Sequence, residues 1–278
     1  MSGLTLLASY PKSGNTWLRA FLTSHRRRGQ AIDVNRDLAR IMNLTSRQLQ
    51  DRHAGLEHED LTPEQVALLR PLTSRCIARD RPGLYKTHDS HLVPPGAREP
   101  AVPADVIDRV VYIVRDPRDV AVSAAHHFGQ PLATSVANIA DPTRILGRSE
   151  TGLNDNVEHF VSSWSAHAAS WIDAEAVNRL VLRYEDLVAQ PDQGFARLCR
   201  FLDLDDTPDA VARSLNASAF ATLAAQEARA GFRERLARAS APFFRSGRAG
   251  DWRRALPPAL AGRIAETQGP MMARLGYL

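Results

Sequence analysis

The sequence of 278 residues lacks long hydrophobic runs. Its longest unbroken apolar runs, such as residues 110–114, hold about five residues, whereas a helix that crosses a bilayer needs roughly 20. The first residues also lack the basic flank, apolar core and small-residue cleavage site of a secretory signal peptide. We therefore expect a cytoplasmic protein that does not enter a membrane.

Cysteine is scarce: Cys76 and Cys199 are the only two, and neither belongs to a Cys-x-x-Cys or a His-rich cluster. A disulfide framework or a structural zinc site is therefore not expected. Both cysteines lie in segments with a helical pattern, and we expect each to be buried as a small apolar residue.

Lysine is also scarce, in contrast to arginine. The chain has 35 basic and 31 acidic side chains, a net charge of +4, and the only lysines are Lys12 and Lys86. A bias toward arginine is typical of a GC-rich genome, and the positive charge suits an anionic ligand without naming one.

The remaining composition is that of a globular protein. Apolar residues make up 44% and charged residues 24%, which excludes a collagen-like, coiled-coil or wholly disordered chain. The length suits one large core, and no internal repeat or linker divides the sequence. We predict a single domain over residues 1–278.

Strand and helix patterns alternate along the chain, as in an α/β fold. The predicted strands are residues 4–8, 83–87, 108–115 and 179–184. The predicted helices are residues 16–25, a helix from residue 63, and residues 118–128, 157–174, 195–202, 208–217 and 257–275. The β-branched run at 108–115 indicates a strand buried on both faces. We predict a central parallel sheet of four to five strands flanked by helices.

Residues 10–17 (YPKSGNTW) combine a glycine turn with the start of a helix. Such a turn offers backbone N–H groups and the positive end of the helix dipole to a phosphate. Lys12 adds a cation, and Ser13 and Thr16 add hydroxyl donors. The standard P-loop differs, because its lysine follows the glycine at a longer spacing. The alternative is an ordinary strand-to-helix turn.

Arg115 stands at the carboxyl end of the strongest strand, where α/β proteins bind ligands. Ser123 follows about two helical turns later. The rigid guanidinium fork of Arg115 matches phosphate oxygens, so the pair could bind a second phosphate. The alternative is that Arg115 pairs structurally with a neighbouring aspartate.

Two further segments carry candidate polar groups. Lys86 and His88 lie two residues apart, on one side of an extended segment. A lone histidine is more often a surface or core residue, and the neighbouring lysine singles this one out. Residues 243–252 (FFRSGRAGDW) form a basic, glycine-rich loop that could wrap an anion, although a solvated surface loop has the same composition.

Five motifs stand in one order along the chain: residues 10–17, 86–88 (KTH), 110–123 (VVYIVRDPRDVAVS), 183–187 (RYEDL) and 243–252. Together they resemble the sulfotransferases that use 3′-phosphoadenosine 5′-phosphosulfate (PAPS), in the cytosolic and bacterial small-molecule enzymes. The resemblance covers essentially the whole chain. It implies a P-loop-like phosphosulfate-binding loop and sulfuryl transfer from PAPS to a hydroxyl, or less readily an amine, of a small molecule, with release of the 3′,5′-bisphosphate (PAP).

The resemblance also implies roles for individual residues. The 5′-phosphosulfate would be held by Lys12, Ser13, Gly14, Asn15 and Thr16. The 3′-phosphate would be held by Arg115, Ser123, Arg245, Ser246 and Gly247. The adenine would lie between Trp17 and Phe220, with Tyr184 and Ser218 at its edge. His88 would be the base, Lys86 would steady the sulfuryl group, and Lys12 would stabilise the leaving oxygen.

The chain departs from the animal enzymes at three points. Asn15 replaces their usual threonine, as in a bacterial variant, and Ser246 replaces a lysine whose charge Arg248 could supply. Their C-terminal dimerisation pattern is not present after Trp252, so the oligomeric state stays open and a homodimer is one option. No Walker-type aspartate for magnesium is present, and we expect no metal.

The acceptor pocket is expected from residues 33–70, 130–156 and 226–241. These stretches hold few aromatics, which favours a polar natural product, sugar or glycopeptide over a flat steroid.

Two other functions are possible for the protein. A P-loop nucleotide kinase is one alternative, opposed by the missing G-K-[ST]. A non-catalytic nucleotide-binding or nucleic-acid-binding module is the other, opposed by the 31 acidic residues that dilute the basic charge.

Overall fold

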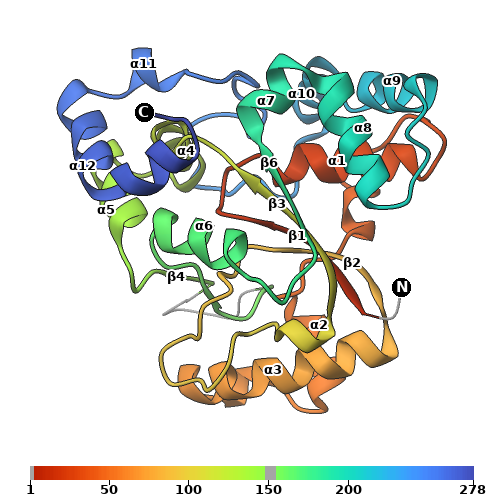
Figure 1. The fold of residues 1–278 in the computed structure, drawn as a ribbon, viewed down its shortest axis with the longest axis vertical. Coiled ribbons are helices and arrows are strands. Elements are labelled where there is room, and N and C mark those ends of the chain that lie inside the picture. Colours follow the sequence, from red (N-terminus) through yellow and green to blue (C-terminus); the bar gives the residue numbers. More distant parts are fainter. Residues whose placement is uncertain (1–2, 148–154) are drawn as a thin grey trace. The chain divides into compact units, whose positions relative to one another are not determined.

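Four strands form the central sheet of the computed structural model, in the order β2-β1-β3-β6 (Figure 1). Their bounds are β1 Leu4–Ser9, β2 Gly83–Thr87, β3 Ile107–Val114 and β6 Arg179–Arg183. β1 and β2 run parallel, with Leu4 opposite Gly83. Every residue of β1 is buried, as are the last five of β3, because both strands are covered on two faces. The predicted α/β class, with a parallel sheet flanked by helices, is confirmed with four strands.

The structure describes residues 3–147 and 155–278, apart from the side chain of Glu59. These residues group into two compact units. The first is drawn from Met1–Tyr10, Met42–Tyr112 and Asp141–Val181, and the second from Pro11–Ile41, Ile113–Ala140 and Leu182–Leu278. The prediction of one domain over residues 1–278 stays a prediction.

The first unit joins the sheet to three helices, α2 Arg47–Ala54, α3 Pro63–Asp80 and α6 Trp164–Ile172, and to the 3₁₀ turns η2 His58–Asp60 and η3 Ala104–Val106. α2 and α3 lie side by side (Figure 1). Thr62 caps α3, because its hydroxyl accepts from the Gln65 N–H while the Gln65 side chain accepts from the Thr62 N–H. With Pro63 as the first helical residue, the predicted start of this helix is confirmed.

The helix predicted over residues 157–174 is wrong in its first half. That part forms β5 His159–Phe160, which pairs antiparallel with β4 Ile145–Leu146. α6 begins only after Ser163, whose hydroxyl accepts from the Ala166 N–H as an N-cap. The hydrogen bond of this serine to the backbone sets the start of the helix, which apolar periodicity does not indicate.

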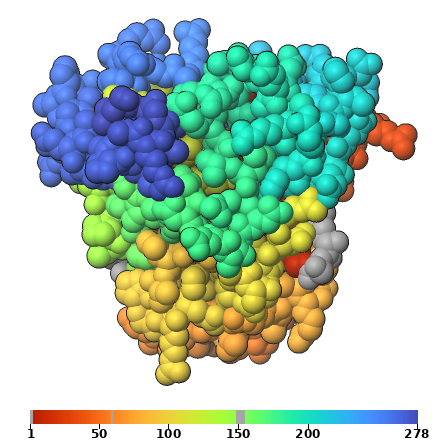
Figure 2. Space-filling view, in the orientation of Figure 1, coloured from red at the N-terminus to blue at the C-terminus, as the bar shows by residue number. Residues whose placement is uncertain are grey.

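The second unit is helical. Its helices are α1 Asn15–His25, α4 Pro117–Phe128, α5 Leu132–Ala140, α7 Tyr184–Ala189, α8 Pro191–Phe201, α9 Pro208–Ala217, α10 Phe220–Ala230, α11 Trp252–Ala255 and α12 Pro258–Arg274, with the 3₁₀ turn η1 Leu38–Arg40. α1 packs on α9, and α8 packs on α7 and α9. α12 packs on α4 and α5, and its blue side chains lie beside the yellow-green ones of α5 in Figure 2.

Two helices lie in stretches expected to build the acceptor pocket, and one cysteine is less buried than predicted. α5 lies inside residues 130–156, of which 148–154 lie outside the described residues. α10 reaches into residues 226–241. Cys199 is buried, as predicted, but Cys76 is only half-buried, at the margin of the buried face of α3. Within residues 3–147 and 155–278, no helix is both long and apolar enough to span a membrane.

Candidate active site

The glycine turn after β1 is shaped to present backbone donors. Lys12 and Gly14 have φ of 69° and 106°, and α1 begins at Asn15. The first N–H groups of a helix have no intrahelical acceptor, and they carry the positive end of its dipole. Ser13 is fully buried, and its hydroxyl has no hydrogen-bond partner in the described part of the chain. Because an unsatisfied buried hydroxyl is costly, this turn fits an anionic oxygen.

Gly14 is required by both its conformation and its neighbours. A Cβ at this position would lie 2.7 Å from Cδ2 of Tyr184 and 3.1 Å from Cδ1 of Ile113. Its φ also lies in the left-handed region, which favours glycine. The glycine turn is therefore packed tightly against the ring of Tyr184.

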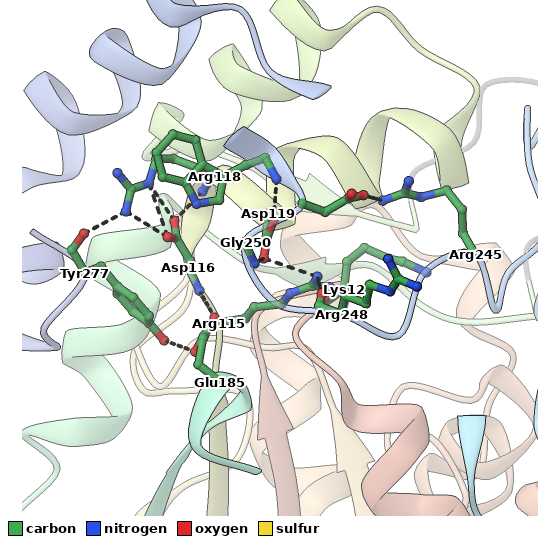
Figure 3. Close-up of polar contacts among 12 residues, drawn as sticks. Lys12, Arg115, Asp116, Arg118, Asp119, Glu185, Arg245, Arg248, Gly250 and Tyr277 are labelled. Carbon is green, nitrogen blue, oxygen red and sulfur yellow. Dashed lines mark hydrogen bonds and ion pairs between the residues drawn. The ribbon is translucent and has the colours of Figure 1, made fainter. Parts of the chain in front are cut away.

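Arg115, which follows β3, links the glycine turn to residues 243–252, the late loop (Figure 3). Its Nη1 donates to the carbonyl of Lys12 over 3.3 Å, and its Nη2 donates to the carbonyl of Arg248 over 3.1 Å. The guanidinium lies over the Tyr184 ring, 4.4 Å from the centroid. It also pairs with Asp119 at 3.5 Å, so the structural alternative for this arginine is present as well.

Asp119 fixes the late loop to the start of α4. Its carboxylate accepts from the N–H groups of Gly250 and Trp252 over 2.7 and 2.8 Å. Within the loop, Arg245 pairs with Asp251 at 2.6 Å (Figure 3). The side chain of Arg248, the predicted substitute for the missing lysine, is exposed.

A buried network supports the segment behind Arg115 (Figure 3). The Glu185 carboxylate accepts from the Asp116 N–H over 3.0 Å and from the Tyr277 hydroxyl over 2.9 Å. Burial raises the pKa of both Glu185 and Tyr277. Arg118 donates to the Asp116 carboxylate and, over 2.6 Å, to the Tyr277 carbonyl. The sequence assigned Glu185 no role, although it stands inside the motif 183–187.

The aromatic residues predicted around an adenine form two groups. Trp17, half-buried, meets the Tyr184 ring edge-on with centroids 6.1 Å apart, and burial raises the Tyr184 pKa. Phe220 is 38% exposed, and Gly247 is packed so closely on its ring that a Cβ would clash. The Ser218 hydroxyl, which is buried, donates to the carbonyl of Ser214 over 2.8 Å.

The other predicted ligand residues are placed as follows. Asn15 is buried in the first turn of α1, and Thr16 accepts a hydrogen bond from Arg19 over 3.2 Å. Ser123 lies half-buried in α4, and Ser246 lies half-buried in the late loop. That either serine shares an anion with Arg115 stays a prediction.

Phe243 and Phe244 anchor the segment before the late loop. Their N–H groups donate to the buried carboxylate of Glu227 over 2.7 and 2.8 Å, and both rings pack against Phe232. The Lys12 ammonium lies 3.8 Å from the centroid of the Phe243 ring. The sequence missed Glu227, because its partners are backbone groups 16 and 17 residues away.

In the first unit, His88 is held in one tautomer. Its Nδ1 lies 2.9 Å from the carbonyl oxygen of Ser9, which can only accept, and 3.2 Å from the Ser9 hydroxyl oxygen, which can accept as well, so Nδ1 carries the hydrogen. Nε2 therefore keeps its lone pair. Burial and the nearby ammonium of Lys86 lower the pKa of His88 well below its usual value, so the ring is neutral at pH 7.

Lys86 belongs to β2, two residues before His88. Its backbone N–H donates to the carbonyl of Met42, and its carbonyl accepts from the Leu44 N–H, each over 2.9 Å. Lys86 thus lies in the predicted strand, and His88 directly follows its last residue, Thr87. Among the residues that the structure describes, no group of three or more His, Cys, Asp or Glu side chains is arranged to hold a metal ion.

Comparisons with known proteins agree on one family. The family model described as the sulfotransferase domain matches residues 4–276. The chain is 26% identical to cytosolic sulfotransferase 16 of Arabidopsis thaliana, over 93% of this chain and 73% of that protein. It is likewise 26% identical to the 3-beta-hydroxysteroid sulfotransferase of Cavia porcellus, over 90% of this chain and 76% of that protein.

Solved structures share the fold. Retinol dehydratase in complex with androsterone and PAP superposes with a TM-score of 0.64 at 17% identity, over 98% of this chain and 81% of that one. A mouse sulfotransferase complexed with PAP gives a TM-score of 0.60 at 18% identity, over 98% and 85% of the two chains.

Proposed function

The chain belongs to the sulfotransferase family, and on this premise we propose that it moves a sulfuryl group from PAPS to a hydroxyl of a small molecule, with His88 as the base. Enzymes of this family use PAPS as cosubstrate and leave PAP as product. The observation that carries the proposal is the imidazole of His88, which donates from Nδ1 to the Ser9 carbonyl and so keeps Nε2 as an acceptor.

PAPS, when bound, supplies a sulfuryl group attached to a strongly anionic leaving group. The fit to this group rests on the buried hydroxyl of Ser13 and on the N–H groups at the start of α1. In our proposal Ser13, Gly14, Asn15 and Thr16 bind the 5′ end. The Lys12 ammonium stabilises the charge that develops on the leaving oxygen.

The 3′-phosphate end is assigned to Arg115. Two backbone carbonyls and the Tyr184 ring orient its guanidinium, which limits the entropy lost when it binds an anion. Ser123, Arg245, Ser246 and Gly247 are proposed as its helpers. Arg248, exposed in the same loop, is proposed to supply the charge that Ser246 lacks.

The adenine is assigned to the faces of Trp17 and Phe220. Tyr184 and Ser218 are proposed at its edge. Because the Ser218 hydroxyl already donates to a helix carbonyl, it can only accept from the adenine, for which the exocyclic amino group is the suitable donor.

His88 is proposed to take the proton of the acceptor hydroxyl at Nε2. A neutral imidazole is the form that can accept a proton, and His88 is in this form at pH 7, although its lowered pKa makes it a weaker base than a free imidazole. The Lys86 ammonium, on the same extended segment, is proposed to steady the sulfuryl group during transfer.

We propose a polar acceptor: a natural product, a sugar or a glycopeptide. The support is compositional, because residues 33–70 contain no Phe, Tyr or Trp and residues 226–241 contain only Phe232. Androsterone and retinol, which are bound in retinol dehydratase structures, are apolar by comparison. They serve as the apolar comparison compounds in an acceptor screen. A bacterial origin and a cytoplasmic location stay predictions, and we propose no oligomeric state.

The test replaces His88 by asparagine. We expect calorimetry to show unchanged binding of PAP, while transfer from labelled PAPS to a panel of sugars, phenols and steroids falls about 10²–10⁴-fold, the usual contribution of a general base. His25→Asn, in the last turn of α1, is the matched control and should transfer normally. Transfer by the His88 variant near the wild-type rate, or loss of PAP binding, would contradict the assignment of His88 as the base.

A further inference from the structure

We propose that the buried ion pair of Arg70 and Asp89 positions His88, so that Arg70 is a positioning residue for the base although it stands 18 residues before it. The inference rests on the proposed role of His88. It assigns a function to a charged pair that neither the sequence motifs nor the proposed chemistry uses.

Arg70 and Asp89 form a two-pronged contact inside the first unit. Nη1 and Nη2 of Arg70, on α3, donate to Oδ1 and Oδ2 of Asp89 over 2.7 and 2.9 Å. The two residues are 2% and 1% exposed. Parallel N–H···O bonds of this kind fix the orientation of both planar groups, which a lysine at the same place could not do.

Asp89 follows His88 directly, and it also holds Thr87, the residue before His88. Its Oδ2 accepts from the Thr87 hydroxyl over 2.9 Å, and its backbone N–H donates to the same hydroxyl oxygen over 3.0 Å. The Asp89 carbonyl accepts from Nε1 of Trp171 over 2.9 Å. The backbone on both sides of His88 is therefore held by buried side chains.

The carbonyl of His88 is held in the same way. Nε2 of His167 lies 3.2 Å from it, and Nδ1 of His167 lies 3.0 Å from the Tyr112 hydroxyl. Because a carbonyl only accepts, the Nε2 of His167 donates and its Nδ1 accepts from the tyrosine. With the backbone fixed, the one remaining freedom of His88 is its ring, which the Ser9 carbonyl orients through Nδ1.

A buried ion pair adds little net stability to a fold. Desolvation of the two charges offsets much or all of their attraction, and an apolar pair of similar size is often at least as stable. The Arg70–Asp89 pair does supply directional restraint, and it supplies it next to the proposed base. A displacement of about 1 Å in a reacting group can reduce turnover about 100-fold, so such restraint has a kinetic value.

The test removes both charges together, in the double variant Arg70→Met with Asp89→Leu. This variant leaves no unpaired buried charge, so we expect it to fold and to bind PAP as the wild type does in calorimetry. We expect the single-turnover rate of transfer to the panel acceptor that reacts best to fall about 100-fold. Arg75→Met is the matched control, because Arg75 lies on the same helix and pairs with Glu99 and Asp105 near the surface.

A second readout does not depend on the acceptor. The readout is the ¹H–¹⁵N spectrum of the imidazole groups. The His88 signal is assigned as the one that His88→Asn loses. In the wild type this signal should show the hydrogen on Nδ1. Lys86, His159 and His167 are the titratable groups that act on this ring, and all are retained in the double variant. We expect the double variant to lose the tautomer preference, because the ring is no longer held against the Ser9 carbonyl.

If the double variant does not fold, Arg70→Lys serves instead, because it keeps the charge and removes only the fork. We expect a slower transfer and a mixed His88 tautomer. A folded variant of either kind with wild-type transfer and an unchanged His88 signal overturns the positioning role and leaves the proposed function intact. Wild-type transfer by His88→Asn would instead refute the proposed base, and this inference with it.

Discussion

Lys12 and Lys86 are the only lysines among 35 basic residues, and both stand in segments assigned to the chemistry. A lysine ammonium is a compact charge on a flexible stem, whereas a guanidinium is a planar fork with fixed directions. The Lys12 ammonium rests on the Phe243 ring, a contact that adapts to small movements of the charge more readily than a hydrogen bond does. Lysine therefore suits a position where the charge to be stabilised moves during the reaction.

We predict that Lys12→Arg and Lys86→Arg each keep the binding of PAP but lose most of the turnover. The positive charge that attracts the nucleotide is retained in both variants, while the ability to follow a moving charge is reduced. Calorimetry with PAP and steady-state rates with labelled PAPS separate the two effects. Arg263→Lys, an exposed position on α12, is the control for the reverse exchange and should change neither quantity. Near-normal rates in both arginine variants would show that the small number of lysines reflects genome composition and not the reaction.

Single residues were predictable where a motif marks them and not where only the fold does. Lys86 lies in the strand that its β-type sequence predicted, and His88 directly follows the last residue of that strand. Glu227 was beyond such reasoning, because its partners are two backbone N–H groups of a later loop. Asp89 was missed for a related reason: Arg70, its partner, is distant in sequence and ordinary in pattern.

At the scale of elements, the glycine turn before α1 is the most constrained feature. We predict that Gly14→Ala lowers the free energy of unfolding by about 1–3 kcal/mol, because the new Cβ meets the Tyr184 ring in a left-handed conformation. It should also weaken the binding of PAP, since the turn must shift. Urea denaturation and calorimetry measure the two effects.

Gly55→Ala is the matched control for that variant. Gly55 also has a positive φ, of 72°, but a Cβ there meets nothing within 4 Å. It should cost only the backbone strain of about 1 kcal/mol and leave the binding of PAP unchanged. Equal effects of the two substitutions would show that strain alone, and not the packing on Tyr184, governs the turn.

Elements with a strong local signal were predicted well. β2 has the predicted bounds, and α3 begins where Thr62 and Pro63 indicate, because capping and proline geometry act within one turn. The helix over residues 157–174 was wrong, because β5 is held by its pairing with β4, a tertiary contact that local propensity does not contain. α10 was missed, although its buried residues Leu223 and Glu227 lie four apart, on one face of the helix.

At the scale of the whole molecule, buried histidines link stability to pH. Burial lowers the pKa of His88, His91, His159 and His167, so the folded state keeps these rings neutral at a pH where the unfolded chain protonates them. The unfolded state then binds more protons, and the free energy of unfolding falls as the pH falls below about 6.5.

We predict a loss of stability between about pH 7.5 and 5.5, of about 1.4 kcal/mol for each histidine that stays neutral over this range. Urea midpoints across the range measure it. His167 is fully buried and its pKa is lowered to about 4, so His167→Gln should make the dependence shallower. A stability that is flat or that rises toward pH 5.5 would contradict the neutral state of these rings.

This chain should bind the 3′,5′-bisphosphate of adenosine in preference to other adenine nucleotides, and thermal unfolding with added nucleotide is the decisive measurement. PAP at 100 times its dissociation constant should stabilise the protein by about 2.7 kcal/mol, a clear rise in Tm. Adenosine 5′-monophosphate should do less at the same concentration, because it lacks the phosphate assigned to Arg115. ATP with magnesium, the ligand pair of a nucleotide kinase, should also do less. A larger shift with ATP and magnesium than with PAP would contradict the binding of PAPS by this chain.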